Sequence, residues 1–182
     1  MTMFHNLCRV SIAFSVLALS LVAGPIAGHA QSTTKGSSGL PLPRFVSLKA
    51  ERVNLRIGPS TDYAVSWRYM KSGLPVEIIR EYENWRQIRD ADGTEGWVNQ
   101  TLLTGERTAV AAPWMRGNGD SVYVMMRRDS NSSAQVIAKL EPGVVLRLRE
   151  CNGNWCQAET SGVSGWISQN EIWGAYPGEA FK

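Results

Sequence analysis

The sequence predicts an all-β protein in which two small β-barrels in tandem follow an N-terminal signal peptide. The chain has 182 residues, which is enough for two small domains. Its second half is similar to its first half at an offset of 70 residues, and short segments of alternating polarity are separated by turn-forming residues. No long segment carries apolar residues at helical spacing, so the pattern indicates small barrels or sandwiches.

Residues 1–30 have the order of features found in a secretory signal. Arg9 is their only charged residue, residues 10–23 are mostly apolar, and residues 28–30 (Gly-His-Ala) place small side chains near a cleavage site. A retained membrane anchor is the alternative, but a spanning helix needs about 20 apolar residues, and residues 10–23 include three serines. We therefore expect cleavage after Ala30, a periplasmic or secreted protein, and no integral membrane span in the mature chain.

The composition of the mature chain argues against most enzymatic chemistry. Both histidines, His5 and His29, would leave with the signal, as would Cys8. Without histidine, neither a Ser-His-Asp nor a Cys-His triad can form, and zinc sites of His and Cys are excluded. The sequence has no glycine-rich phosphate loop. We expect no catalytic residue, no metal site and no cofactor.

The charged residues bear on two further functions, carboxylate-based catalysis and nucleic-acid binding. A pair of carboxylates could act as acid and base, but the candidates lie in a predicted turn beside Gly93, where solvation explains them better (Asp90, Asp92 and Glu95). The formal net charge of +3 is too small to indicate a nucleic-acid partner. We expect no nucleic-acid binding.

The repeat defines the organisation of the chain. At an offset of 70, Asn54–Ile88 aligns with Val124–Ala158 without a gap, and at 69, Gly96-Trp97-Val98 aligns with Gly165-Trp166-Ile167. Residues before the repeat are small, polar and rich in Gly and Pro, which is typical of a flexible leader. The predicted segments are a leader (31–44), a first domain (45–105), a linker (106–112), a second domain (113–176) and a tail (177–182).

Within each unit, alternation with period 2 indicates half-buried strands. In the second unit, Leu146 and Leu148 alternate with Arg147 and Arg149. In the first unit, residues 76–81 alternate in the same way. Turns between strands are predicted at Gly-Pro-Ser (58–60), Lys-Ser-Gly (71–73), Asp-Gly (92–93), Pro-Gly (142–143) and Asn-Gly (152–153).

The two cysteines of the mature chain fit one such hairpin. If residues 152–155 form its loop, Cys151 and Cys156 face each other across an antiparallel pair, within reach of a disulfide, which an oxidising compartment favours. The equivalent residues of the first unit are Glu81 and Arg86, so we hypothesise that a cross-strand ion pair there corresponds to the disulfide. A redox-active pair is the alternative, but the C-x4-C spacing and the lack of a helix N-terminus argue against it.

The first unit carries a recognisable order of motifs. It opens with Val-Asn-Leu-Arg-x-Gly-Pro-Ser (53–60), continues with Gly73, an alternating strand and Trp85, and closes with Gly-Trp-Val (96–98) and Leu102-Leu103. In this order it resembles the bacterial SH3 domain family (SH3b), particularly its exported tandem subfamily. The likeness covers residues 45–105 and, more loosely, 113–173, because Met125–Ser130 replaces the opening motif.

This resemblance implies two SH3-like barrels and a binding role. Related domains attach to cell-wall peptidoglycan, often beside a catalytic domain that cuts it. We therefore expect a periplasmic module that binds peptidoglycan or another envelope component. The alternative is a protein-interaction module that docks on an envelope enzyme or receptor.

Aromatic residues provide the candidate ligand site. Trp85, Trp97, Trp155 and Trp166 recur at matched positions in both units, which suggests a structural role in the core or along its edge. Trp67 and Tyr69 lie two residues apart on one strand, near Tyr63, and their counterparts (Ile137, Lys139 and Ser133) are not aromatic. We expect these three aromatics to contact a ligand, with Arg56 and Arg68 pairing with its carboxylates. A core role for Trp67 is the alternative.

The end of the second unit carries two more aromatic residues, Trp173 and Tyr176. They could close the second barrel, or they could dock the two barrels together.

Overall fold

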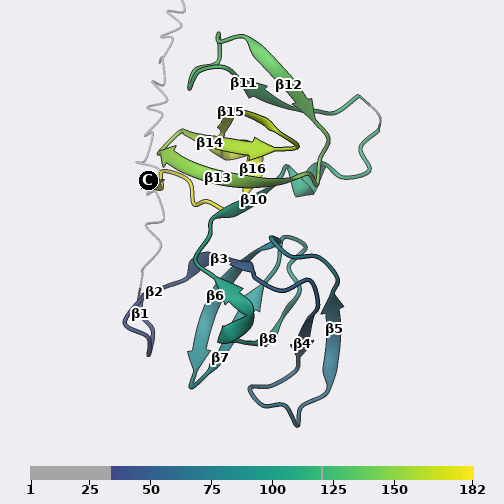
Figure 1. The fold of residues 1–182 in the computed structure, drawn as a ribbon, viewed down its shortest axis with the longest axis vertical. Helices are drawn as coiled ribbons and strands as arrows, with labels where there is room; N and C mark the ends of the chain where they lie inside the picture. The colour runs from purple at the N-terminus through teal and green to yellow at the C-terminus, as the bar shows by residue number, and fades with distance from the viewer. Residues whose placement is uncertain (1–33, 120) are drawn as a thin grey trace, which may run out of the picture. The chain divides into compact units, whose positions relative to one another are not determined.

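The computed structural model describes residues 34–119 and 121–182, which belong to one compact unit spanning 32–182. These residues form two large antiparallel sheets, each curled into a small barrel, and a separate two-stranded sheet (Figure 1). The prediction of an all-β fold with two barrels in tandem is confirmed. The expected signal peptide (1–30) and its alternative, a membrane anchor, lie outside the described residues. Within the described ranges, no helix has the length and hydrophobicity needed to cross a membrane.

The first barrel is a sheet with the strand order β5-β4-β8-β7-β6-β3-β9. A hairpin of two very short strands precedes it, and one 3-10 turn (η1) connects β8 to β9. The elements are β1 (Thr34–Lys35), β2 (Pro41–Leu42), β3 (Arg44–Leu48), β4 (Val53–Arg56), β5 (Val65–Tyr69), β6 (Pro75–Tyr82), β7 (Trp85–Arg89), β8 (Glu95–Asn99), η1 (Gln100–Leu102) and β9 (Leu103–Thr104).

The second barrel repeats this topology with the order β12-β11-β15-β14-β13-β10-β16, and β17 adds to β13. Its elements are β10 (Thr108–Ala111), η2 (Pro113–Met115), β11 (Val124–Arg127), β12 (Val136–Leu140), β13 (Val145–Asn152), β14 (Trp155–Thr160), β15 (Val163–Ser168), η3 (Gln169–Glu171), β16 (Ile172–Trp173) and β17 (Ala180–Phe181).

Each barrel has its own apolar core. Alternation places Val53 and Leu55 of β4 in the first core, and Leu146 and Leu148 of β13 in the second. The charged residues between the two leucines of β13 are exposed, as the sequence pattern predicted.

A β-bulge interrupts the alternation in β6 and in β13. The register shifts between Ile78 and Arg80 in one hairpin and between Leu148 and Glu150 in the other. A bulge adds one residue to one strand and so changes which side chains face the core. Glu81 and Cys151, which follow the bulges, are therefore buried, with the Glu81 side chain only 1% exposed.

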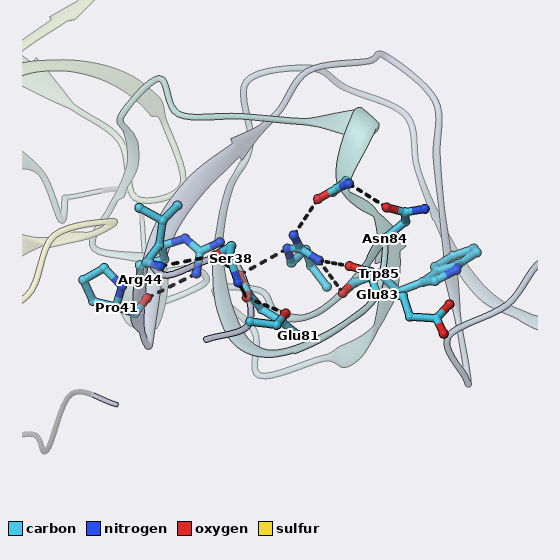
Figure 2. A network of polar contacts seen from close by, with 11 residues as sticks. Ser38, Pro41, Arg44, Glu81, Glu83, Asn84 and Trp85 are labelled. Carbon is cyan, nitrogen blue, oxygen red and sulfur yellow. Dashed lines mark hydrogen bonds and ion pairs between the residues drawn. The ribbon is translucent and has the colours of Figure 1, made fainter. Parts of the chain in front are cut away.

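The predicted correspondence between an ion pair and a disulfide is confirmed. Cys151 faces Cys156 across β13 and β14 with a Cα–Cα distance of 4.0 Å, and the two form a disulfide. In the first barrel, Glu81 faces Arg86, and the Arg86 Nε atom lies 3.3 Å from a Glu81 carboxylate oxygen. Figure 2 shows Glu81 within a larger polar network that includes Ser38 and Arg44.

The gap-free alignment of the repeat at an offset of 70 is wrong by one residue over β4 and β5. Val53 pairs with Tyr69 as Val124 pairs with Leu140, which is an offset of 71. The difference arises because the loop after β5 is one residue longer than the loop after β12. The true counterparts of Tyr63, Trp67 and Tyr69 are therefore Ala134, Ala138 and Leu140.

This shift restores part of the opening motif to the second unit. Arg127 is the counterpart of Arg56, and each arginine donates a hydrogen bond to the carbonyl group seven residues later, at 2.7 Å in the first barrel and 2.8 Å in the second. The guanidinium group thus fixes the loop between the first two strands of the motif in both units.

The segments predicted to be a leader, a linker and a tail all contain strands. The expected linker (106–112) contains β10, which is buried and pairs with β13 and β16. The expected leader (31–44) contains the β1–β2 hairpin from residue 34 onward, and the expected tail (177–182) contains β17. Sequence pattern missed them because these strands are two to four residues long, too short to show periodicity.

Aromatic side chains pack between the barrels. Phe45 of β3 lies 4.9 Å from the ring of Trp173 and 4.7 Å from the ring of Tyr176, measured between ring centroids. The Tyr176 hydroxyl donates to the buried Glu77 carboxylate at 2.9 Å, and the hydroxyls of Ser47 and Thr108 lie 2.7 Å apart. Trp173 and Tyr176 therefore contact the first barrel, as one of the two sequence alternatives supposed.

Candidate ligand-binding site

A groove of about 500 Å³ runs along the end of β5 in the first barrel. We call it the Trp67 groove. Residues of β5, the following loop, the β7–β8 turn and the start of the second barrel line it: Trp67, Arg68, Tyr69, Met70, Leu74, Pro75, Asp90, Ala91, Asp92, Thr94, Val110 and Arg116.

The groove combines an exposed apolar surface with polar groups. Trp67 is 57% exposed and Met70 is 63% exposed, and Leu74 and Pro75 continue the apolar lining. Ligand sites typically pair such an apolar surface with a few convergent polar groups. Trp67 is thus available to a ligand, and the alternative that it belongs to the core is wrong.

Tyr69 has a different role from the one expected. It is 6% exposed and belongs to the core of the first barrel, and its hydroxyl donates to Asp90 at 2.9 Å. Burial, reinforced by the negative charge and hydrogen bond of Asp90, raises the pKa of the Tyr69 hydroxyl far above its ordinary value. Two residues on one strand face differ in exposure because the β7–β8 turn covers Tyr69.

Asp90 organises that turn. Its second carboxylate oxygen accepts hydrogen bonds from the backbone N–H groups of Asp92 and Thr94, at 3.0 Å and 2.8 Å. The carboxylate is therefore fully used in holding the wall of the groove. This arrangement differs from the acid–base pair considered from the sequence, because Asp92 forms an ion pair of 2.8 Å with Arg116.

The two arginines of the groove are anchored but partly accessible. The Arg68 Nε atom donates to the Asn54 side chain at 2.9 Å, and the Arg116 side chain remains 41% exposed beside Asp92. Both could offer further N–H donors to a carboxylate or carbonyl group of a ligand.

Two of the expected site residues lie outside the groove. Arg56 bonds the Tyr63 carbonyl oxygen, and the Tyr63 ring lies against Gly58, where an added β-carbon would meet the ring at 2.6 Å. Tyr63 is 47% exposed but does not line the groove. The structure therefore brings together Trp67, Arg68 and Tyr69, and leaves Arg56 at the end of β4 and Tyr63 in the loop that follows.

The four recurring tryptophans occupy an intermediate environment. Trp85, Trp97, Trp155 and Trp166 are all half-buried, and among the described residues neither core cluster contains them. The expectation that these tryptophans lie in the core is wrong. A structural role along the edge of the core stays a prediction.

Several lining residues were missed by sequence reasoning. Met70 and Leu74 flank the turn predicted at residues 71–73, and Arg116 comes from the segment after η2. No local pattern marks them, because tertiary packing alone brings residue 116 beside residue 92. Within the described residues, no group of three or more His, Cys, Asp or Glu side chains is arranged to hold a metal ion.

Comparison with known proteins gives a family and more distant relatives. A sequence model of the family described as bacterial SH3 domain matches residues 49–105 and 120–174. The Bacillus subtilis (strain 168) protein YrvJ, provisionally named an N-acetylmuramoyl-L-alanine amidase, is 26% identical over 130 residues, which is 69% of this chain and 24% of that protein. The chain thus spans about a quarter of the length of this relative.

Solved structures match more weakly. NlpC2 of Trichomonas vaginalis matches at 8% identity and a TM-score of 0.31, over 72% of this chain and 48% of that one. An NlpC/P60 family protein of Bacillus cereus ATCC 10987 has the same identity and TM-score, over 71% of this chain and 55% of that one.

Proposed function

The chain belongs to the bacterial SH3 domain family, and on this premise we propose that it is a non-catalytic binding protein of the bacterial cell envelope that recognises peptidoglycan. The name of its B. subtilis relative describes an enzyme that acts between N-acetylmuramic acid and L-alanine. That name supports a wall ligand for the part of the relative that this chain resembles. The proposed role here is binding, without the cleavage.

The observation that carries this proposal is the exposed indole of Trp67 in a groove with polar groups along its wall. The C–H face of a sugar ring can stack on an aromatic face, and carboxylates of a stem peptide can pair with guanidinium groups. Arg68 and Arg116 are placed in the same groove as the indole. One fragment of peptidoglycan presents both kinds of chemical group.

The groove is held in shape before a ligand arrives. The hydroxyl of Tyr69 is bonded to Asp90, and Asp90 fixes the turn that forms one wall. Arg116 ties that turn to the segment after η2. Such preorganisation lowers the conformational cost of binding.

The proposed location is outside the cytoplasm. The Cys151–Cys156 disulfide is typical of proteins in oxidising compartments, and peptidoglycan is encountered there. The expected signal at residues 1–30 supports the same location.

Co-sedimentation with purified peptidoglycan sacculi tests the proposal. The chain, produced with its disulfide formed, should pellet in a saturable way, and Trp67→Ala should weaken pelleting by about tenfold or more, the size of effect seen for aromatic anchors. Trp114→Ala is the matched control, because Trp114 is 53% exposed but does not line the groove. Tyr69→Phe is preferable to Tyr69→Ala, since the buried ring supports the core.

The outcomes separate the two functional classes. If the folded chain stays in the supernatant, wall binding is wrong, and saturable binding to an envelope protein becomes the leading explanation of the groove. If Trp67→Ala and Trp114→Ala pellet like the wild type, the wall is bound but the groove is not the site.

A further inference from the structure

A second hollow, of about 540 Å³, lies on the second barrel at the β13–β14 turn. We call it the Trp155 hollow. One aromatic residue and five uncharged polar residues line it: Ser130, Asn152, Asn154, Trp155, Ser168 and Asn170. The absence of charged residues from this lining distinguishes it from the Trp67 groove.

The polar side chains of the hollow are largely without intramolecular partners. Among the described residues, the side chains of Ser130, Asn154, Ser168 and Asn170 make no hydrogen bond to another protein group. Asn152 differs, because its side-chain oxygen Oδ1 accepts from the backbone N–H groups of Asn154 and Trp155. Four neutral polar side chains thus face one space beside an indole with their donors and acceptors free.

The same positions of the first barrel are internally satisfied. Asn84, the counterpart of Asn154, accepts a hydrogen bond from the Gln100 side chain at 2.9 Å, and Asn99, the counterpart of Ser168, accepts from the backbone N–H and hydroxyl of Thr101. Figure 2 shows Asn84 at the end of this network, beside Trp85. In the first barrel, the side-chain amides at these positions therefore form hydrogen bonds within the barrel.

The disulfide explains why the two barrels differ. In the first barrel, the Arg86 guanidinium donates to the side-chain oxygen (Oε1) of Gln100 and so orients the Gln100 side-chain amide toward Asn84. In the second barrel, Cys156 takes the place of Arg86, and Gln169, the counterpart of Gln100, donates instead to the Glu179 carbonyl oxygen at 2.8 Å. Asn154 is left without its partner and is exposed.

We propose that the Trp155 hollow binds an uncharged sugar residue of a glycan chain. A sugar ring presents an apolar C–H face that packs on an indole, and hydroxyl or acetamido groups that both donate and accept hydrogen bonds. Asparagine amides and serine hydroxyls match those groups because they also do both. The lining of the hollow has no charged side chain, so it offers no ion-pair partner to a carboxylate or phosphate.

This inference adds a sugar-binding site to the proposed function. It rests on that function only in taking peptidoglycan as the source of the glycan. Under that function, the glycan strand of peptidoglycan contacts the second barrel, while the Trp67 groove takes other parts of the wall. The two sites involve different barrels and different residues, so each can fail alone.

Titration of the full chain with chitotriose, a peptide-free trimer of N-acetylglucosamine, tests the inference by NMR. The backbone amide resonances of residues 152–155 and 168–170 should shift on addition of the saccharide. Asn154→Ala and Asn170→Ala, both at exposed positions, should each weaken binding by about threefold to tenfold, the size expected for one lost hydrogen bond. Asn84→Ala is the matched control in the first barrel and should leave the affinity unchanged.

Three results would overturn the inference: no shift of these resonances at high saccharide concentration, shifts confined to the Trp67 groove, or equal affinity of the wild type and the asparagine variants. The sacculus assay is independent of this one. Pelleting that depends on Trp67, without chitotriose binding at Trp155, would retain the proposed function and reject the second site. Chitotriose binding at Trp155 without pelleting would retain the second site and reject the proposed function.

Discussion

Glu81 is a buried carboxylate that is stabilised by several donors at once. The Ser38 backbone N–H lies 2.7 Å and the Ser38 hydroxyl 2.8 Å from its oxygens, the Arg44 guanidinium lies at 2.6 Å, and Ser37 and Arg86 add longer contacts. Burial alone would raise the pKa of Glu81, but these hydrogen bonds and the positive charge of Arg44 lower it from 4.5 to about 2. The β1–β2 hairpin is thus anchored to the barrel through one side chain.

Replacing Glu81 by glutamine should change the pH dependence of stability. Because the pKa of Glu81 is lower in the folded chain than in the unfolded chain, its contribution, of order 3 kcal/mol, is present above pH 4.5 and is lost as the pH falls toward 2. The wild type should therefore be more stable than Glu81→Gln at pH 7, and the gap should close near pH 2. Urea unfolding at several pH values measures this.

Glu83→Gln is the control for this prediction, because Glu83 is exposed in the same hairpin and should have little effect on stability. A gap between wild type and Glu81→Gln that has the same size at pH 7 and pH 2 would contradict the role assigned to the Glu81 charge.

At the scale of elements, the β6–β7 and β13–β14 hairpins stabilise the two facing positions next to their turns in different ways. Each carries a bulge that buries a residue close to the hairpin turn. The first fills these positions with Glu81 and Arg86 and needs the β1–β2 hairpin to complete the hydrogen bonds of the carboxylate. The second fills them with a disulfide, which needs no such partners, and β17 pairs with its edge.

Replacing both Cys151 and Cys156 by alanine should destabilise the second barrel by about 2 kcal/mol, the loop-closure estimate for a bridge between residues this close in sequence. Urea unfolding of the double variant and of reduced wild type should give the same loss. Binding at the Trp67 groove should persist at native conditions, because the lining reaches this hairpin only through Val110, which pairs with Val145 at the opposite end of β13 from Cys151. Equal stability of the oxidised and reduced protein would show that the disulfide is energetically neutral.

At the scale of the whole molecule, the contacts between the barrels determine whether they act as one body. Phe45 is only 8% exposed, and its ring contacts come from Trp173 and Tyr176 of the second barrel. Glu77 adds one polar contact between the barrels, because it accepts from Tyr176, and it also accepts from Arg89 within the first barrel. The Trp67 groove depends on this packing, since Val110 and Arg116 complete its lining.

Phe45→Ala should cost about 3–5 kcal/mol, as for other buried phenylalanines, and should separate one unfolding transition into two. Differential scanning calorimetry of the wild type should show a single transition. Tyr176→Phe, which keeps the ring and removes only the hydroxyl bond to Glu77, should lower stability by a smaller amount and keep one transition. Two transitions in the wild type would show that the barrels unfold independently.

The family resemblance of the first unit predicted the positions of residues more accurately than the repeat alignment did. Gly96 and Gly165 were matched as part of a Gly-Trp motif, and the structure shows why each is glycine: an added β-carbon would lie 2.9 Å from the Arg56 carbonyl oxygen in one barrel and 2.6 Å from that of Arg127 in the other. Over β4 and β5, where no such glycine fixes the register, the alignment was wrong by one residue. A one-residue slip changes the face assigned to every side chain of a strand.

The candidate site was predicted in part. An exposed Trp67 beside Arg68 was expected and found, whereas Tyr69 proved to be core and Tyr63 lies elsewhere. Strand period indicates which residues share a face, but it does not indicate which part of that face another segment covers. The β7–β8 turn covers Tyr69 and leaves Trp67 open.

The all-β class, the two units, the disulfide pair and its ion-pair counterpart could be predicted from the sequence, because alternation, turn residues and hairpin spacing are local properties. Tertiary structure alone decided that residues 108–111 are a strand, that Phe45 packs against Tyr176, and that Arg116 closes the groove beside Asp92. These contacts join segments far apart in the chain. Their energy comes from burial and pairing between segments, which leave no periodic pattern in either segment alone.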